Sequence, residues 1–284
     1  MKSIFTNVLF SFFALLISKN CLACPFWSHF GLSNCPPEIA EFPLTPTSTP
    51  QWQNINGYWR LVELNDNLID GTLIPATVGM DGVLNNPNNV TFHGDITANS
   101  NRDSGLGFIG QDEDIKIPDY NGLHFTNALS ISFWAKKTRN GFYERILYKD
   151  NNLGNEFVWG VQYIRDGRLE FNVGNTNIDS NFYVRSSSEI LDTKWHHFVV
   201  TYTSCNNETS IYIDGSLDSR GSPSFNYQNW PTGLEISNGV LRLGSVRYNG
   251  NTFYGRLLLQ DVALWNSTLS ASEVLQIYRS QLGN

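Results

Sequence analysis

Residues 192–217, DTKWHHFVVTYTSCNNETSIYIDGSL, hold two apolar runs separated by a short polar segment. The first run, residues 195–203, is apolar on both faces, which is typical of a central strand that is covered on both sides. The second run ends in Asp214-Gly215, a dipeptide that favours a hairpin because both turn residues need a positive φ. This stretch therefore predicts antiparallel strands joined by tight turns.

Alternating apolar and polar runs flank this stretch on both sides, with clusters of Gly, Asn, Asp and Ser between them. These runs are LSISFWAKK (129–137), FVWGVQYI (157–164), RLEFNVG (168–174), VLRLGSV (240–246) and GRLLLQDVALW (255–265). In the second run the alternation places Phe157 on the same face as Trp159 and Val161. The pattern predicts an all-β fold, a single antiparallel β-sandwich.

One helix is expected at the C-terminus. Ser270-Ala271-Ser272-Glu273 reads as a capping box, in which the serine and glutamate side chains each satisfy a backbone N–H group. Val274, Leu275 and Tyr278 follow as a short apolar stripe.

The composition excludes some classes of protein. The chain has 284 residues, of which 41% are hydrophobic, 16% charged and 13% aromatic, so it can bury a core and is not generally disordered. Its 19 Lys and Arg residues against 26 Asp and Glu give a net charge of −7. Without a basic excess or a basic run, nucleic acid is not expected as a partner.

The N-terminus has the pattern of an export signal. Lys2 precedes an apolar run, residues 8–17, that is too short to span a bilayer but has the length of a signal-peptide core. Residues 1–23 are predicted to be a signal peptide cleaved after Ala23, which leaves no membrane span and places the protein outside the cell or on its surface. A buried N-terminal helix and a lipid anchor at Cys24 are the alternatives.

Residues 24–53 are predicted to form a proline-rich spacer before a domain at residues 54–284, since residues 36–53 hold five of the eleven prolines. An oxidising compartment would permit a disulfide bond between Cys24 and Cys35. Cys205 is then left over and is interpreted as an exposed thiol.

Six segments occur in an order that resembles the laminin-G-like members of the concanavalin A-like lectin/glucanase superfamily, over about residues 58–280. They are GFIGQDEDIKIPD (107–119), LSISFWAKK (129–137), DTKWHHFVVTY (192–202), SIYIDGSL (210–217), LRLGS (241–245) and DVALWNSTLSASEV (261–274). The resemblance implies a jelly-roll β-sandwich. It leaves the ligand open, because this superfamily includes lectins, adhesion modules and glycosidases.

The glycosidases of that superfamily use an E-x-D-x-x-E string, in which two carboxylates converge on the scissile bond, and this sequence has no such string. The nearest acidic group is Asp112-Glu113-Asp114, where only the first and third residues share a face. It is interpreted as a solvated loop or an ion-binding rim.

Trp195-His196-His197 is interpreted as structural, because adjacent side chains of a strand point to opposite faces and the two histidines cannot hold one ion. The sequence also has no G-x-S-x-G string for serine hydrolysis. We therefore expect no catalytic residues and no enzyme.

Asp261 is the acid most in need of a partner, because the alternation places it with Leu259 and Ala263 on one face. Calcium fits such a carboxylate. The resemblance implies a structural calcium near this strand that also takes oxygens from an N-terminal loop, where Asp81 stands in ATVGMDG (76–82). Calcium bound by Asp81 and Asp261 is one expectation, and a hydrogen-bonded Asp261 that holds the terminal strand is the other.

Two loops combine aromatic residues, which pack against sugar rings, with groups that hydrogen-bond to hydroxyls. The candidate ligand-binding residues are Tyr227, Asn229, Trp230, Arg247, Tyr248 and Asn249. The alternative for Trp230 is that it closes the edge of the core.

These observations predict a secreted, non-catalytic carbohydrate-binding or adhesion module whose partner is a glycan or an extracellular or surface protein. The alternatives are a protein-binding structural surface module and, less favoured, a glycoside hydrolase of the same superfamily.

Overall fold

The computed structural model describes residues 43–62, 68–86, 90–92, 105–154, 156–175, 180–222 and 233–282. The predicted signal peptide, Cys24, Cys35, and the loop residues Tyr227, Asn229 and Trp230 lie outside the described residues. Within these ranges, the structure contains no helix with the length and apolar character needed to cross a membrane.

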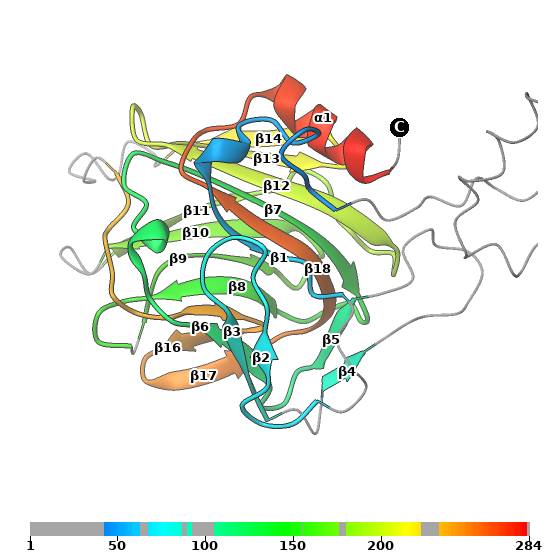
Figure 1. Cartoon of the computed structure of the whole chain (residues 1–284), viewed down its shortest axis with the longest axis vertical. Coiled ribbons are helices and arrows are strands. Elements are labelled where there is room, and N and C mark those ends of the chain that lie inside the picture. The colour runs from blue at the N-terminus through cyan, green and yellow to red at the C-terminus, as the bar shows by residue number, and fades with distance from the viewer. Residues whose placement is uncertain are drawn as a thin grey trace, which may run out of the picture. The chain divides into compact units, whose positions relative to one another are not determined.

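Two antiparallel sheets face each other (Figure 1). Sheet A has the order β14-β13-β12-β7-β18-β5-β4, and β1 also pairs with β18. Its strands are β1 (Ile55–Trp59), β4 (Val90–Phe92), β5 (Leu106–Ile109), β7 (Ala128–Lys137), β12 (Trp195–Thr203), β13 (Glu208–Ile213), β14 (Ser216–Gly221) and β18 (Arg256–Trp265).

Sheet B has the order β11-β10-β9-β8-β15-β6-β3-β2. Its strands are β2 (Leu73–Ile74), β3 (Gly82–Asn85), β6 (Asp114–Ile117), β8 (Glu144–Asp150), β9 (Phe157–Tyr163), β10 (Leu169–Asn175), β11 (Ser180–Arg185) and β15 (Leu241–Leu243). A separate hairpin consists of β16 (Ser245–Tyr248) and β17 (Asn251–Tyr254). The predicted all-β antiparallel sandwich is confirmed.

The remaining elements are short helices. The 3-10 helices η1 (Trp52–Asn54) and η3 (Asn121–Leu123) lie in connections, and α1 (Ala271–Gln281) follows the last strand. Ser270 and Glu273 form the expected capping box at the start of α1. The predicted hairpin turn is also present, because Asp214 and Gly215 join β13 to β14 with φ values of 49° and 78°.

The main core lies between the two sheets. It includes Phe133 and Phe198 from sheet A, whose rings stack with centroids 5.4 Å apart, and Tyr163 from sheet B, whose ring meets Phe198 edge-on at 5.7 Å. In β10, Leu169 and Phe171 are fully buried in this core, as the alternation predicts. Close packing of this kind ties the two sheets together.

A second apolar cluster covers the outer face of sheet A. Val199 and Trp265 of this sheet pack there with Val274 and Ile277 of α1, which Figure 1 shows in red beside β13 and β14. Strands β1, β12, β13 and β18 of sheet A are thus buried on both faces, which explains why residues 195–203 are apolar on both sides.

The described end of the predicted spacer, residues 43–53, joins this second cluster. Leu44 is buried there, and its backbone N–H donates to the Tyr58 hydroxyl of β1 at 3.1 Å. Proline restricts this segment without preventing it from packing. The boundary at residue 54 stays a prediction, although contacts with the domain begin at least ten residues earlier.

β-bulges overturn two expectations about side-chain direction. In β18 the register shifts between Gln260 and Ala263, so Leu259 faces the main core while Ala263 faces the second cluster. In β9 a shift opposite Lys149 turns Phe157 away from the core side chain of Trp159. An extra residue in a strand reverses the alternation beyond it.

Candidate functional site

The outer face of sheet B differs from that of sheet A, because it carries polar side chains and exposed aromatic rings. A row of directly paired residues crosses six of its strands. The row is Lys116, Arg242, Tyr148, Gly160, Asn172 and Tyr183. We call the part of this face that lies on β8, β9, β10 and β11, together with the β16–β17 hairpin, the candidate face.

The centre of the candidate face is an aromatic platform. A side chain at Gly160 would collide with the Tyr148 ring, so the glycine lets this ring lie against the strand. Tyr148 meets Phe157 edge-on with ring centroids 5.1 Å apart, and Phe157 in turn lies 6.4 Å from the ring of Tyr248. Of these three rings, Tyr148 is buried and Tyr248 is 41% exposed.

A second row on the same face is polar and runs through Arg145, Gln162, Glu170 and Arg185. Arg185 Nε donates to Glu170 at 2.7 Å, and Gln162 Nε2 donates to the other oxygen of this carboxylate at 2.5 Å. Asn172 Nδ2 adds a bond to that second oxygen at 3.1 Å. Glu170 thereby holds the side chains of three strands in one plane.

Arginine side chains stack on the exposed aromatic rings of this face. Arg185 lies 4.2 Å above the centre of the Tyr183 ring, and Tyr183 is 52% exposed. Arg145 lies 5.2 Å from the ring centre of Tyr143 and 5.9 Å from that of Phe253. Such pairs keep the rings rigid while leaving one side of them to solvent.

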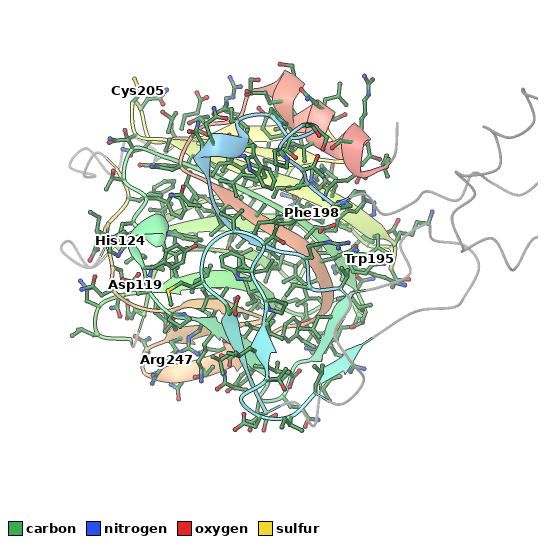
Figure 2. All side chains as sticks on the ribbon, viewed as in Figure 1. Asp119, His124, Trp195, Phe198, Cys205 and Arg247 are labelled. Carbon is green, nitrogen blue, oxygen red and sulfur yellow. The ribbon has the colours of Figure 1, made fainter. Side chains whose placement is uncertain are left out.

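The hairpin holds three of the predicted binding residues. Tyr248 and Asn249 are exposed at its turn, where Asn249 has a φ of 49°. Arg247 is half-buried in β16, on the opposite face of this strand, and Figure 2 labels its position. The structure therefore places Tyr248 and Asn249 beside the candidate face, while their role in binding stays a prediction.

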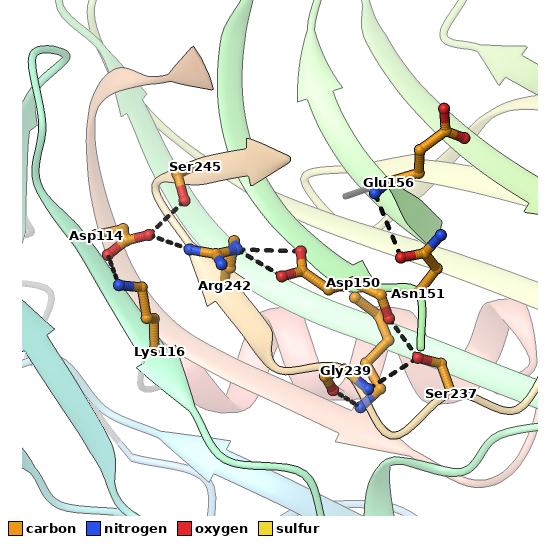
Figure 3. A network of polar contacts seen from close by, with 10 residues as sticks. Asp114, Lys116, Asp150, Asn151, Glu156, Ser237, Gly239, Arg242 and Ser245 are labelled. Atoms are coloured by element: carbon orange, nitrogen blue, oxygen red, sulfur yellow. Dashed lines mark hydrogen bonds and ion pairs between the residues drawn. The ribbon is translucent and has the colours of Figure 1, made fainter. Parts of the chain in front are cut away.

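A buried ion network supports the base of the hairpin (Figure 3). Arg242 donates to Asp150 at 2.8 Å and to Asp114 at 2.7 Å, and Asp114 also accepts from the Ser245 hydroxyl at 2.7 Å. Burial raises the pKa of Asp150, which Arg242 opposes. The network joins β6, β8 and β15 to the first residue of β16.

The acidic group 112–114 is built differently from the expectation. Glu113 is fully buried, and its carboxylate accepts bonds from the backbone N–H groups of Gly110, Gln111 and Asp112. Asp114 is also buried, in the network just described. The expected solvated loop or ion-binding rim is wrong for these two residues, because backbone N–H groups of the turn hydrogen-bond the Glu113 carboxylate and Arg242 forms an ion pair with Asp114.

The two histidines of β12 point to opposite faces, as predicted. His197 is buried and its Nε2 lies 2.8 Å from the Ser132 hydroxyl. His196 lies between two carboxylates, with Nδ1 at 2.7 Å from Asp214 and Nε2 at 3.0 Å from Asp192. The structural interpretation of this motif agrees with these contacts.

His196 gives the fold a dependence on pH. The hydrogen bond with Asp214 raises the pKa of His196, and the bond with His196 helps to lower the pKa of Asp192 despite burial. A histidine whose pKa is raised in the folded state stabilises the fold fully when the pH is below the unfolded-state pKa of about 6.5. This stabilisation is lost as the pH rises through the folded-state pKa. We expect His196→Gln to lower the free energy of unfolding by about 1 kcal/mol at pH 5.5 and by less at pH 9.

Urea denaturation of wild type and variant at both pH values measures this difference. His124→Gln, which removes a histidine paired with Asp119 on the other side of the fold, is the matched control. An equal deficit of the His196 variant at both pH values would contradict the prediction.

The two residues predicted to bind calcium have separate protein partners. Asp261 is buried and accepts from the Tyr58 hydroxyl at 2.9 Å, while the exposed Asp81 accepts from the backbone N–H of Ala76 at 2.8 Å. Across the described ranges, no group of three or more His, Cys, Asp or Glu residues is arranged to hold a metal ion. The geometry matches the hydrogen-bond alternative for Asp261, and calcium stays a prediction.

Cys205 is exposed, at the edge of the molecule in Figure 2, and forms no disulfide bond among the described residues, while a free thiol in the whole protein stays a prediction.

The two-sheet sandwich, covered on sheet A and carrying an aromatic and polar face on sheet B, has the layout of a jelly-roll domain. A sequence model of the concanavalin A-like lectin/glucanases superfamily matches residues 109–275, which is more than half of the chain. The chain belongs to this superfamily.

A clostridial protein is among its relatives. The non-toxic nonhemagglutinin type E of Clostridium botulinum is 26% identical over 222 residues, which are 76% of this chain and 17% of that protein. The chain thus spans about a sixth of the length of that relative.

Solved structures share the fold. The receptor binding domain of botulinum neurotoxin type G superposes with a TM-score of 0.56 at 18% identity, over 80% of this chain and 51% of that chain. The ligand binding domain of botulinum neurotoxin serotype D, solved in complex with N-acetylneuraminic acid, gives a TM-score of 0.56 at 16% identity over 80% and 51%. At such identities the likeness shows the fold alone.

Proposed function

We propose that this protein is a secreted, non-catalytic module that binds glycans with the candidate face. The observation that carries the proposal is the combination on this face of exposed tyrosine rings with fixed polar side chains. Tyr183 and Tyr248 present aromatic surface, and Arg185, whose side chain is 40% exposed, presents N–H donors beside Tyr183, where Glu170 holds it. Sugars offer C–H surfaces and hydroxyl groups that match these two features.

The state of the acidic side chains supports binding without catalysis. Glycoside hydrolysis needs two carboxylates that reach the same bond from a cleft. Asp114 and Asp150 are both buried against Arg242, and Glu170 is engaged by Arg185 and Gln162. These carboxylates hold the face together, and we assign them no role in proton transfer.

Two of the structural neighbours support a glycan as the ligand. One was solved with N-acetylneuraminic acid, and another is described as entering cells through two ganglioside molecules. Those are properties of the neighbours, each of which is about twice as long as the region that this chain matches. The signal-peptide pattern of residues 1–23 supports export of the protein. An exported protein can reach glycans on cell surfaces.

A glycan array probed with the full-length chain tests this function. We expect binding to a limited set of glycans, and we expect Tyr183→Ala to weaken it at least about tenfold, since a lost stacking contact of about 1.4 kcal/mol has that effect. Leu217→Ala on β14 is the matched control, because Leu217 is similarly exposed, at 48%, but belongs to sheet A.

Absence of binding to every glycan would reject the function. In that case the protein-binding alternative would be tested by capture of surface proteins, since one neighbour was solved in complex with rat synaptotagmin II. Release of reducing sugar from a bound polysaccharide would instead show a glycosidase.

A further inference from the structure

We propose that Tyr143, Arg145, Gln162 and Arg165 form a subsite for the acidic group of a saccharide. The inference rests on the proposed function and adds the chemical class of the ligand. In this subsite a carboxylate or sulfate group lies against the two guanidinium groups, and the sugar ring to which it is attached lies on Tyr143.

The first support is the charge of Arg145 and Arg165. In the part of the chain that the structure describes, neither guanidinium has an acidic side chain within ion-pair distance. Three other arginines near this face do: Arg139 lies 2.5 Å from Glu144, Arg185 lies 2.7 Å from Glu170, and Arg168 lies 3.5 Å from Glu189. These two cations therefore have no paired carboxylate among the described residues, although the chain has a net charge of −7.

The second support is the geometry around Tyr143. Both guanidinium groups lie close to its ring, with Arg145 at 5.2 Å and Arg165 at 5.3 Å from the ring centre. The three side chains come from different places, since Tyr143 precedes β8, Arg145 lies in β8, and Arg165 lies in the turn after β9. Tyr143 is still 42% exposed, so a ligand can reach the ring while it contacts both guanidinium groups.

The third support is an unsatisfied acceptor. Gln162 pairs directly with Arg145 across β8 and β9, and it is only 6% exposed. Its amide nitrogen is taken by Glu170, whereas its Oε1 atom has no hydrogen-bond partner among the described residues. A buried acceptor without a donor is costly, and a ligand hydroxyl would supply the donor.

These three features select an acidic saccharide rather than a neutral one. The guanidinium fork binds carboxylate and sulfate groups through paired N–H donors, and a neutral sugar gives it no charge to bind. The exposed tyrosine ring beside both cations favours a sugar ring carrying that group over a small free anion.

The experiment uses the full-length chain on an array in which sialylated, uronic-acid and sulfated glycans are each printed beside the neutral parent. The best pair is then titrated by calorimetry. We expect at least one acidic glycan to bind about tenfold more tightly than its parent, and its affinity to fall with added salt. Arg145→Gln and Arg165→Gln should each remove most of this advantage, measured as the ratio of the affinities for the acidic glycan and its neutral parent.

Arg220→Gln is the matched control, because it removes the same charge from the exposed β14 strand of sheet A. A thermal melt of each variant confirms that it is folded. A preference for acidic glycans that persists in both Arg145→Gln and Arg165→Gln would overturn the subsite. Binding of neutral glycans only would also overturn the subsite, but it would leave the proposed function standing. No glycan binding of any kind would overturn both.

Discussion

Replacing Arg242 with methionine is expected to lower the free energy of unfolding by about 3–5 kcal/mol, because it removes the cation that bridges two buried carboxylates. The side chain of Arg242 is 7% exposed and forms ion pairs with Asp114 and Asp150, whose side chains are 3% and 2% exposed. Methionine fills much of the volume but leaves these carboxylates facing each other. Urea denaturation at pH 7 measures the loss.

Two further measurements distinguish an electrostatic cause from a simple packing defect. Burial already raises the pKa of Asp150. A carboxyl group whose pKa is higher in the folded state than in the unfolded state lowers the free energy of unfolding as pH rises. The deficit of the Arg242 variant should therefore shrink between pH 7 and pH 5. Adding Asp114→Asn and Asp150→Asn should restore part of the stability. A pH-independent deficit below about 1 kcal/mol, without rescue, would contradict the network's role.

Replacing Tyr58 with phenylalanine is expected to cost about 1–3 kcal/mol. The Tyr58 hydroxyl donates to Asp261 at 2.9 Å and accepts from the backbone N–H of Leu44 at 3.1 Å, so one oxygen links the N-terminal segment, β1 and β18. Burial raises the pKa of this hydroxyl well above its ordinary value, which keeps it protonated as a donor. Denaturation at pH 7 and at pH 9 should give the same loss.

Asp261→Asn is the companion variant. Asparagine tolerates the left-handed conformation of residue 261, where φ is 50°, and its amide oxygen still accepts from Tyr58. We expect a smaller loss than for Tyr58→Phe. Adding calcium chloride or a chelator tests the calcium prediction in the same samples: a melting temperature that rises with calcium in wild type but not in Asp261→Asn would establish the ion at this residue.

Much of the fold could be predicted because its strands alternate regularly. The run through Leu169 and Phe171 faces the core as predicted, and the capping residues Ser270 and Glu273 begin the expected helix. The failures at Phe157 and Leu259 come from bulges, which add a residue to one strand without any apolar signal in the sequence.

Fewer residues of the candidate face could be predicted from the sequence. Tyr248 and Asn249 were found because aromatic and amide residues stand together in one loop. Arg145, Gln162 and Tyr183 were missed because each occupies an ordinary polar position of an alternating strand, and only the pairing of β8, β9, β10 and β11 brings them side by side. Alternation shows which side chains point away from the core, but it does not show which of them become neighbours when the strands pair.

An amide NMR titration of the full-length chain tests most directly whether glycans bind the candidate face. The ligand is the strongest glycan from the array. We predict that the shifted resonances cluster on β8, β9, β10, β11 and the β16–β17 hairpin, with Gln162 and Tyr183 among the most affected. Shifts confined to sheet A and α1, with the β8–β11 resonances unchanged, would contradict it.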